Sequence, residues 1–401
     1  MDVLNAVLIG GKGFEPYEVL YSKISDFEHK FSIKVNILHR FSHPELNAFK
    51  DNLNSSNDID VISSHTSFLR SYKHLYLDLI EIDPENVKIL LSDLPGLLRR
   101  AVTIKEEVLI APRFIDVSSL HYRISIFNKI DEEPPKTWDE LLQVAIKIKE
   151  RKINTHPYTF AARGHALVGR FMEILHSFGG KMIDRDQFAF YSQEGIEALQ
   201  FLVDLHAKYK VTHPRTPDFF YDDVSQAFKS GEVAMALDWP GWDYVYRDPK
   251  QSSIWDDFSI ALPPRGRGGL WVYGGSHGLS VIRWSRKKTL ATTFVLFMVS
   301  PENQYFESKS QGFLPARSSV FTMLLKDSKD NYFESHRLSI YRKIIEEAYL
   351  PVKIVKWREF TEILWPILNN AIRGEIKAED ALKIAYEKVK YLEKFQVELG
   401  E

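Results

Sequence analysis

Two tryptophans, Trp239 and Trp242, follow the apolar run Val233–Leu237 and share a short loop with Pro240 and Gly241. The run is long enough for one buried strand, so both indoles are predicted to lie just beyond its carboxyl end. Ligands of open α/β sheets bind outside the carboxyl ends of strands. Aromatic faces attract the slightly positive C–H groups on one face of a sugar ring. The pair therefore predicts a site that binds a hydroxyl-rich molecule by stacking.

A competing pattern lies in Gly274-Gly275-Ser276-His277-Gly278, which satisfies G-x-S-x-G, the nucleophile elbow of serine hydrolases. That motif needs a strand before it, a helix after it, and Asp or Glu followed by His later in the chain. Here 279–282 is predicted as a strand, and only His336 follows. We interpret the match as chance and predict that Gly275 lies with its backbone against a ligand, with Ser276 available as a donor.

An enzyme is the alternative hypothesis, either a serine hydrolase or a glycoside hydrolase. Two carboxylates suited to glycoside hydrolysis are placed by folding, so the sequence leaves that possibility open. Other catalytic and binding motifs are missing, because the chain has no H-E-x-x-H, no Walker loop and no EF-hand ladder. His39 and His43 are four apart, but Pro44 argues against a continuous helix through both. We predict no catalytic residues, no metal and no cofactor.

Charged groups hydrogen-bond sugar hydroxyls more strongly than neutral groups do. Asp116 and Arg40 are the predicted charged partners of the ligand. Lys12, His65 and Gly275 are the next candidates for polar contacts with it. Arg163 lies in a glycine-containing loop before the predicted helix 168–178, and either a ligand contact or an ordinary surface position fits it. Trp239, Trp242 and Trp357 are the predicted stacking residues.

Composition excludes several classes of function. The chain has 401 residues, a formal charge of −2 and no cysteine. Near-neutral charge without a basic patch gives no case for nucleic acid or an anionic membrane surface. The absence of cysteine excludes disulfides and thiol nucleophiles. Aromatic residues make up 13% of the chain, which suits a site that binds by stacking.

The elements that must position these groups follow from periodicity. Val3–Ile9 is a predicted strand that ends in the turn 10–13, and apolar residues at helical spacing follow over 16–31. Predicted strands over 33–37 and 58–63 complete a βαβαβ unit, the start of a doubly wound sheet. Thr137 and Glu140 form a predicted capping box. Further helices are predicted over 168–178, 194–208, 290–299, 357–374 and 378–392, with a strand over 278–282.

Several strings resemble one known family. One pattern consists of Phe228, Ser230-Gly231-Glu232 and Ala234-Met235, followed by a Trp, by Ile260-Ala261-Leu262-Pro263-Pro264 and by a Gly pair. The order of these pieces resembles that in the solute-binding subunits of bacterial and archaeal sugar ABC importers. Asp116, Leu120 and Tyr122-Arg123 resemble the family's first interdomain crossing. The strings 134–141 and 312–317 are also similar to family sequences.

The resemblance implies an α/β, two-lobed periplasmic-binding-protein fold, with doubly wound sheets joined by a three-strand hinge. The N-terminal lobe would comprise 1–112 and 268–313, and the C-terminal lobe 113–267 and 314–401. His65, after the third strand, and Trp357, early in a C-terminal helix, stand where family members place ligand contacts.

The implied function is high-affinity binding of a sugar or oligosaccharide in an interlobe cleft and its delivery to the permease subunits of an ABC transporter. The resemblance implies a monomer. A polyol, a peptide or a glycerol phosphodiester stays open as the solute.

The expected location is periplasmic or extracellular, with the protein secreted or anchored to the membrane. The N-terminus lacks the basic region and cleavage site of a signal peptide. We therefore expect that the natural signal was removed and that Met1 was added. A native Met1 would instead indicate a cytoplasmic protein and would exclude the importer role.

Overall fold

The structure, a computed structural model, describes residues 2–12, 15–153, 155–347 and 354–397. The chain divides into two compact units. Unit 1 comprises Met1–Asp116 and Gly275–Asp330, and unit 2 comprises Val117–Gly274 and Asn331–Glu401. The chain therefore passes between the units three times. Both units are mixed α/β, and each is described by itself below.

Unit 1 is built on a six-stranded sheet in the order β14-β6-β13-β3-β1-β2. The first three strands in the sequence pair in parallel, with β1 between β2 and β3. β13 returns antiparallel to β3, and β14 antiparallel to β6. The strands are β1 (Val3–Ile9), β2 (Lys34–Phe41), β3 (Val61–His65), β6 (Ala111–Val117), β13 (Gly274–Val281) and β14 (Leu314–Pro315). A separate hairpin pairs β4 (Thr103–Ile104) with β5 (Glu107–Val108).

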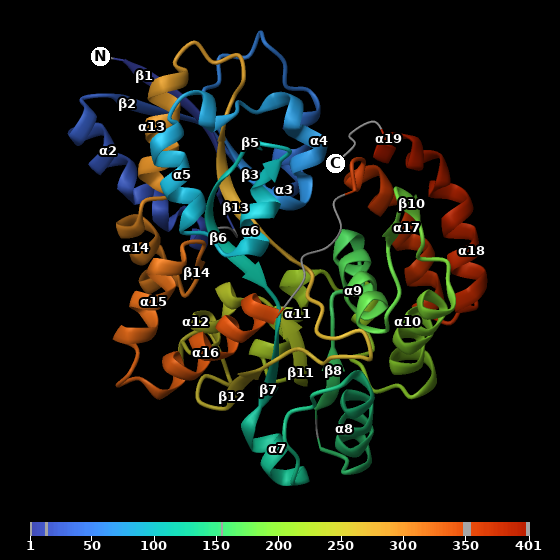
Figure 1. Cartoon of the computed structure of the whole chain (residues 1–401). Helices are drawn as coiled ribbons and strands as arrows, with labels where there is room; N and C mark the ends of the chain where they lie inside the picture. Colours follow the sequence, from blue (N-terminus) through green and yellow to red (C-terminus); the bar gives the residue numbers. More distant parts are fainter. Residues whose placement is uncertain (1, 13–14, 154, 348–353, 398–401) are drawn as a thin grey trace. The chain divides into compact units, whose positions relative to one another are not determined.

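Helices from both ends of unit 1's sequence pack together. Figure 1 shows the orange helices α13 and α14 beside the blue N-terminal elements. Phe27 of α2 contacts Phe294 and Phe297 of α13, with ring centroids 5.0 and 5.4 Å apart. The helices are α1 (Glu15–Glu18), α2 (Ile24–Phe31), α3 (His43–Asp51), α4 (Leu69–Tyr72), α5 (Pro84–Ser92), α6 (Gly96–Val102), α13 (Lys288–Met298), α14 (Pro301–Gln311) and α15 (Ser318–Asp327).

Unit 2 has a four-stranded sheet in the order β12-β7-β11-β8. β11 is parallel to β8 and antiparallel to β7, so it lies in the middle of the sheet. All six residues of β11 are buried, as the apolar run at this place predicts. The strands are β7 (Ser119–Arg123), β8 (His156–Thr159), β11 (Val233–Asp238) and β12 (Phe258–Ala261), with a small hairpin of β9 (Ile183–Asp184) and β10 (Gln187–Phe188).

The helical layer of unit 2 is centred on α9 (Gly164–Ser177), which is buried from Ala166 to Ser177. Helices from the end of the chain pack against α9 and α10, and Figure 1 shows the red α17 and α18 beside these green helices. The other helices are α7 (Ile124–Ile130), α8 (Trp138–Glu150), α10 (Gln193–Val203), α11 (Tyr221–Lys229), α12 (Asp243–Tyr246), α16 (Tyr332–Glu347), α17 (Trp357–Ile372), α18 (Ala378–Val389) and α19 (Glu393–Val397).

Capping interactions predicted from the sequence are present at the starts of several helices. Thr137 accepts the backbone N–H of Glu140 at 3.1 Å, and the Glu140 carboxylate accepts the N–H of Lys136 at 2.6 Å. The return bond thus goes to the residue before the cap. Lys288–Met298 is helical where 290–299 was predicted, and Ser300 caps α14.

The strand predicted over 278–282 begins four residues earlier, at Gly274. Its glycines weaken the sequence signal for a strand, but the residues opposite on β3 supply the pairing. In the described part of the chain, no helix is both long and apolar enough to cross a membrane.

Candidate functional site

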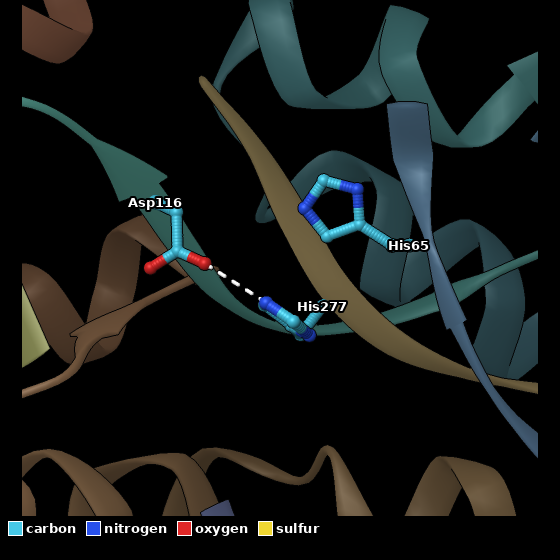
Figure 2. Close-up of side chains that lie close together, drawn as sticks. All are labelled: His65, Asp116 and His277. Carbon is cyan, nitrogen blue, oxygen red and sulfur yellow. Dashed lines mark ion pairs between the residues drawn. The ribbon is translucent and has the colours of Figure 1, made fainter. Parts of the chain in front are cut away.

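Three polar side chains of unit 1 meet on one face of its sheet. His65 ends β3, and His277 stands directly opposite it on β13. Asp116 lies on β6, the next strand across. Side chains paired across neighbouring strands share a face, so all three converge although they are far apart in sequence. One ligating atom from each lies within 4.8 Å of the others, and Figure 2 shows the three side chains together.

The closest contact in this cluster joins Asp116 Oδ2 to His277 Nε2, at 3.1 Å. The two side chains are only 13% and 7% exposed. Burial raises the pKa of Asp116 to about 8, against a smaller opposing effect of Arg113. Burial, with the charges of Arg113 and Lys50, lowers the pKa of His277 to about 3. Both shifts favour the neutral forms, because a buried site disfavours charge.

His65 is held in one tautomer by the turn that follows β3. Its Nδ1 accepts the backbone N–H of Ser67 at 3.1 Å, so that nitrogen carries no hydrogen in the neutral ring. The hydrogen of neutral His65 is then on Nε2, which Figure 2 shows pointing towards Asp116 and His277. This imidazole therefore presents a donor to the cluster.

A third imidazole adjoins the cluster from α3. The ring of His43 lies 4.7 Å from that of His277 and 6.4 Å from that of His65. His39 and His43 were not expected to form a metal pair, and they lie on different elements, with His39 on β2 and His43 in the first turn of α3. His277, which the sequence analysis did not select, is the residue that joins the group. The signal available was its position in a glycine-rich crossing.

Ser276 and Gly275 both make close contacts within unit 1. Ser276 is fully buried, donates its hydroxyl hydrogen to the carbonyl of Phe114 at 2.7 Å, and lies inside β13. Its hydroxyl is thus bonded to backbone, and no strand-to-helix turn exposes it as an elbow nucleophile. Gly275 is close to His65, because an added Cβ would lie 2.6 Å from Cε1 of that ring. Its backbone therefore contacts an imidazole of the cluster.

The two predicted basic residues at the N-terminal edge of unit 1 lie apart from this cluster's contacts. Arg40 is on the edge strand β2 and donates to Oε2 of Glu18 at 2.9 Å. The same carboxylate accepts the N–H of Gly11 at 2.6 Å, so it links β2 to the glycine turn after β1. Lys12 lies in that turn and is exposed.

Unit 2 carries an aromatic group that includes two predicted stacking residues. Trp239 follows β11 and is partly exposed. Tyr273 lies between the two tryptophans, with its ring 6.3 Å from Trp239 and 6.2 Å from Trp357. The Tyr273 and Trp357 planes differ by 27°, an offset stack. We call Trp239, Tyr273 and Trp357 the aromatic row. Trp242 is partly exposed in the same short turn as Trp239.

Tyr273 is held in place by α9. An added Cβ at Gly169 would lie 2.6 Å from Cδ1 of its ring, so this glycine lets the ring lie against the helix. The backbone N–H of Tyr273 donates to Glu173 at 2.6 Å. Glu173 also accepts from Ser118 at 3.1 Å and pairs with Arg170. Tyr273 was not among the predicted site residues, although an aromatic residue just before a Gly pair was a visible signal.

The backbone of Trp239 is held by the side chain of Asp238. Oδ1 of this buried carboxylate accepts the N–H of Trp239 at 2.9 Å, and Oδ2 accepts from Ser225 at 2.8 Å and from Tyr246. Burial raises the pKa of Asp238 to about 6 in spite of these donors. The indole of Trp239 also meets the edge of Tyr221 at 5.3 Å.

Trp357 and Arg163, two further predicted site residues, differ in exposure: Trp357 is buried and Arg163 is exposed. Trp357 is only 3% exposed, and its Nε1 has no hydrogen-bond acceptor among the described residues. Arg163 is exposed and lies 3.7 Å from Asp223, which fits the ordinary surface position. His165, two residues on, contacts Phe220 and Tyr221, and burial lowers its pKa to about 4.

Comparison with known proteins shows which proteins this chain resembles. A putative binding protein of Brucella abortus is 22% identical over 271 residues, which span 67% of this chain and 63% of that relative. A probable ABC transporter-binding protein of Deinococcus radiodurans is 23% identical over 231 residues, or 55% of this chain and 54% of that one. The chain thus matches less than two thirds of the length of these curated relatives.

Among solved structures, maltose-bound MalE3 of T. maritima superimposes with a TM-score of 0.85 at 25% identity, covering 97% of this chain and all of that one. This agreement confirms the two-lobed periplasmic-binding-protein fold, and these relatives are binding proteins and not enzymes. The sequence profile of bacterial extracellular solute-binding proteins matches residues 24–332, most of the chain. The chain belongs to the bacterial extracellular solute-binding protein family.

Proposed function

We propose that this protein binds a sugar or oligosaccharide and delivers it to the permease of an ABC transporter. The aromatic row of unit 2 is the observation that carries the choice of solute. A partly exposed indole at the end of a central strand, in edge contact with the ring of Tyr273, offers the apolar face that a pyranose requires. The maltose in the T. maritima relative and the transporter named for the Deinococcus relative support the same choice.

Unit 1 supplies the complementary chemistry in this proposal. His65 presents an N–H donor, and Asp116 presents its carboxyl group, next to the backbone of Gly275. Hydroxyl groups both donate and accept, so donors and acceptors side by side suit them. That both units contact one ligand stays a prediction. So do the assignments of Lys12, Arg40, Arg163 and Trp242 to the site.

The proposal includes a location and an oligomeric state. We place the protein outside the cytoplasmic membrane, secreted or anchored, where a family of extracellular solute-binding proteins meets its solutes. We propose that it acts as a monomer. Size-exclusion chromatography with light scattering would give the mass of one 46.5 kDa chain, and a dimer mass would contradict this.

A thermal-shift screen tests the solute class. The purified protein is heated with glucose, maltose, maltotriose, ribitol, a dipeptide and a glycerol phosphodiester in parallel. A ligand present at 100 times its dissociation constant stabilises by about 2.7 kcal/mol, which raises the unfolding midpoint by several degrees. We expect a rise with at least one saccharide. A rise only with the peptide or the phosphodiester would overturn the sugar assignment.

The hydrolase alternative receives no support from the site. Because the hydroxyl of Ser276 is buried and bonded to a carbonyl, we expect no turnover of chromogenic esters or glycosides. Turnover that Ser276→Ala abolishes would restore the enzyme hypothesis.

A further inference from the structure

The His65, Asp116 and His277 side chains in unit 1 form a group with the composition of a metal site. Their strands β3, β6 and β13 are neighbours, with β13 in the middle. The antiparallel register that places His277 opposite His65 fixes both imidazoles on one face of the sheet. The ligating atoms lie within 4.8 Å of one another, and rigid strands hold all three residues. Figure 2 shows the nitrogen and oxygen atoms directed towards a common point.

We propose that His65, Asp116 and His277 bind a divalent transition-metal ion, with Zn²⁺ as the preferred ion. Two imidazole nitrogens and one carboxylate oxygen are a donor set that zinc accepts in proteins, with an open fourth position. Calcium and magnesium prefer sites made of oxygen alone, so the imidazoles disfavour them. This inference concerns unit 1 alone and does not depend on which solute the protein carries.

The spacing of the donors fits such an ion after small movements. Bonds of about 2.1 Å in tetrahedral geometry separate donor atoms by roughly 3.4 Å. His277 Nε2 and Asp116 Oδ2 are already 3.1 Å apart. Donor atoms at the outer limit of 4.8 Å within the group would have to approach one another by about 1 Å. The cation would replace the hydrogen that joins Asp116 to His277.

Binding at His65 has one identifiable cost. A metal bound at Nε2 requires the ring hydrogen to move to Nδ1, and Nδ1 can then no longer accept the N–H of Ser67. A single hydrogen bond contributes far less than the coordination of a structural zinc ion does, so coordination outweighs the lost bond.

The charges around the group also permit a cation. The guanidinium of Arg113 acts on both Asp116 and His277, and it is paired with the buried carboxylate of Glu307. Lys50 acts on His277 as well, but burial lowers its pKa to about 7, which reduces its charge at neutral pH. The fourth coordination position is left to water or to an oxygen of the solute.

Cobalt is the probe that tests the site, because Co²⁺ in a protein site of low coordination number absorbs visible light far more strongly than the aqueous ion. Untagged protein is treated with a chelator, dialysed and titrated with Co²⁺, and Zn²⁺ affinity is then measured by calorimetry. We expect one equivalent of Co²⁺ to produce the intense bands and one equivalent of Zn²⁺ to remove them. A wild-type spectrum equal to that of aqueous Co²⁺ would overturn the proposal, whatever the variants do.

Variants assign the ligands. His277→Gln and Asp116→Asn should each abolish the cobalt bands and weaken Zn²⁺ binding about 100-fold or more, since even outer partners of metal ligands contribute 10–100-fold. His39→Gln is the matched control, because His39 is an exposed histidine on β2 of the same unit. Equal zinc affinity in wild type, His277→Gln and Asp116→Asn would contradict the assignment. Sugar binding by metal-free protein would be a separate result that tests only the proposed function.

Discussion

The imidazole of His65 lies against the backbone of Gly275, so closely that an added Cβ at that glycine would come within 2.6 Å of Cε1 and 2.9 Å of Nε2. Thr66 Oγ1 lies 2.9 Å from the same position. The glycine is therefore required by its neighbour on β3. This contact also sets where the N–H donor of His65 points.

Replacing Gly275 with Ala should force the His65 ring to move. Overpacking of this kind costs about 1–3 kcal/mol, and we expect a loss of that size in the free energy of unfolding measured with urea. Gly96→Ala is the control in the same unit, because the nearest atom to a Cβ there is the flexible end of Arg100 at 3.7 Å. Equal stability of the two variants would contradict the close contact between His65 and Gly275.

Gly169 should be intolerant of alanine although it lies inside a helix. Gly→Ala in a helix ordinarily stabilises by about 1 kcal/mol. Here the new methyl would meet the Tyr273 ring at 2.6–2.9 Å, so we expect lower thermal stability and weaker solute binding by calorimetry. The cost should disappear when Tyr273→Ala is added, because the colliding ring is then absent. A stabilised Gly169→Ala protein would contradict the position of Tyr273 against α9.

Trp239→Ala should weaken solute binding by about 2 kcal/mol, roughly 30-fold, with the fold intact. The reason is the loss of the partly exposed indole that begins the aromatic row. Trp255→Ala serves as the control, since Trp255 is 43% exposed in the same unit and makes no contact with the row among the described aromatic pairs. Unchanged affinity in Trp239→Ala, measured by calorimetry, would remove this residue from the site.

Lys50→Met should stabilise the protein at neutral pH. Lys50 is 3% exposed on α3, and burial lowers its pKa from 10.5 to about 7. The unfolded chain therefore holds the proton more tightly, and the stability of the wild type should rise as the pH rises from about 7 towards 10.5. Methionine removes this dependence, with a gain of about 1–4 kcal/mol at pH 7 that shrinks towards pH 10.5.

Urea unfolding of wild type and variant at several pH values measures this effect. Lys88→Met is the control, because Lys88 is exposed on α5 and its replacement should change stability by less than about 0.5 kcal/mol at every pH. A Lys50→Met protein that is less stable than wild type at pH 7 would indicate that the amine is charged and that its cation–π contacts with Tyr72 and Tyr76 dominate.

Local interactions explain what was predictable from the sequence. The strand Val3–Ile9, the capped helices after Thr137 and Ser300, and the buried strand before Trp239 were all visible in short windows. Their signals are periodicity and capping, which depend on neighbours in the chain. The order of the short strings around Ser230-Gly231-Glu232 was enough to indicate the family that the comparisons confirm.

The contacts within the candidate site depended on strand pairing and helix packing. His277 became part of a group with His65 and Asp116 only through the order of β6, β13 and β3, which places residues from three distant segments on one face. Tyr273 became part of the aromatic row through the close approach of α9 at Gly169. The same packing buried the Ser276 hydroxyl against Phe114, which the G-x-S-x-G pattern alone did not reveal. Residue types and local periods thus determined the elements and the family, whereas the partners of each polar group were decided by which strands became neighbours.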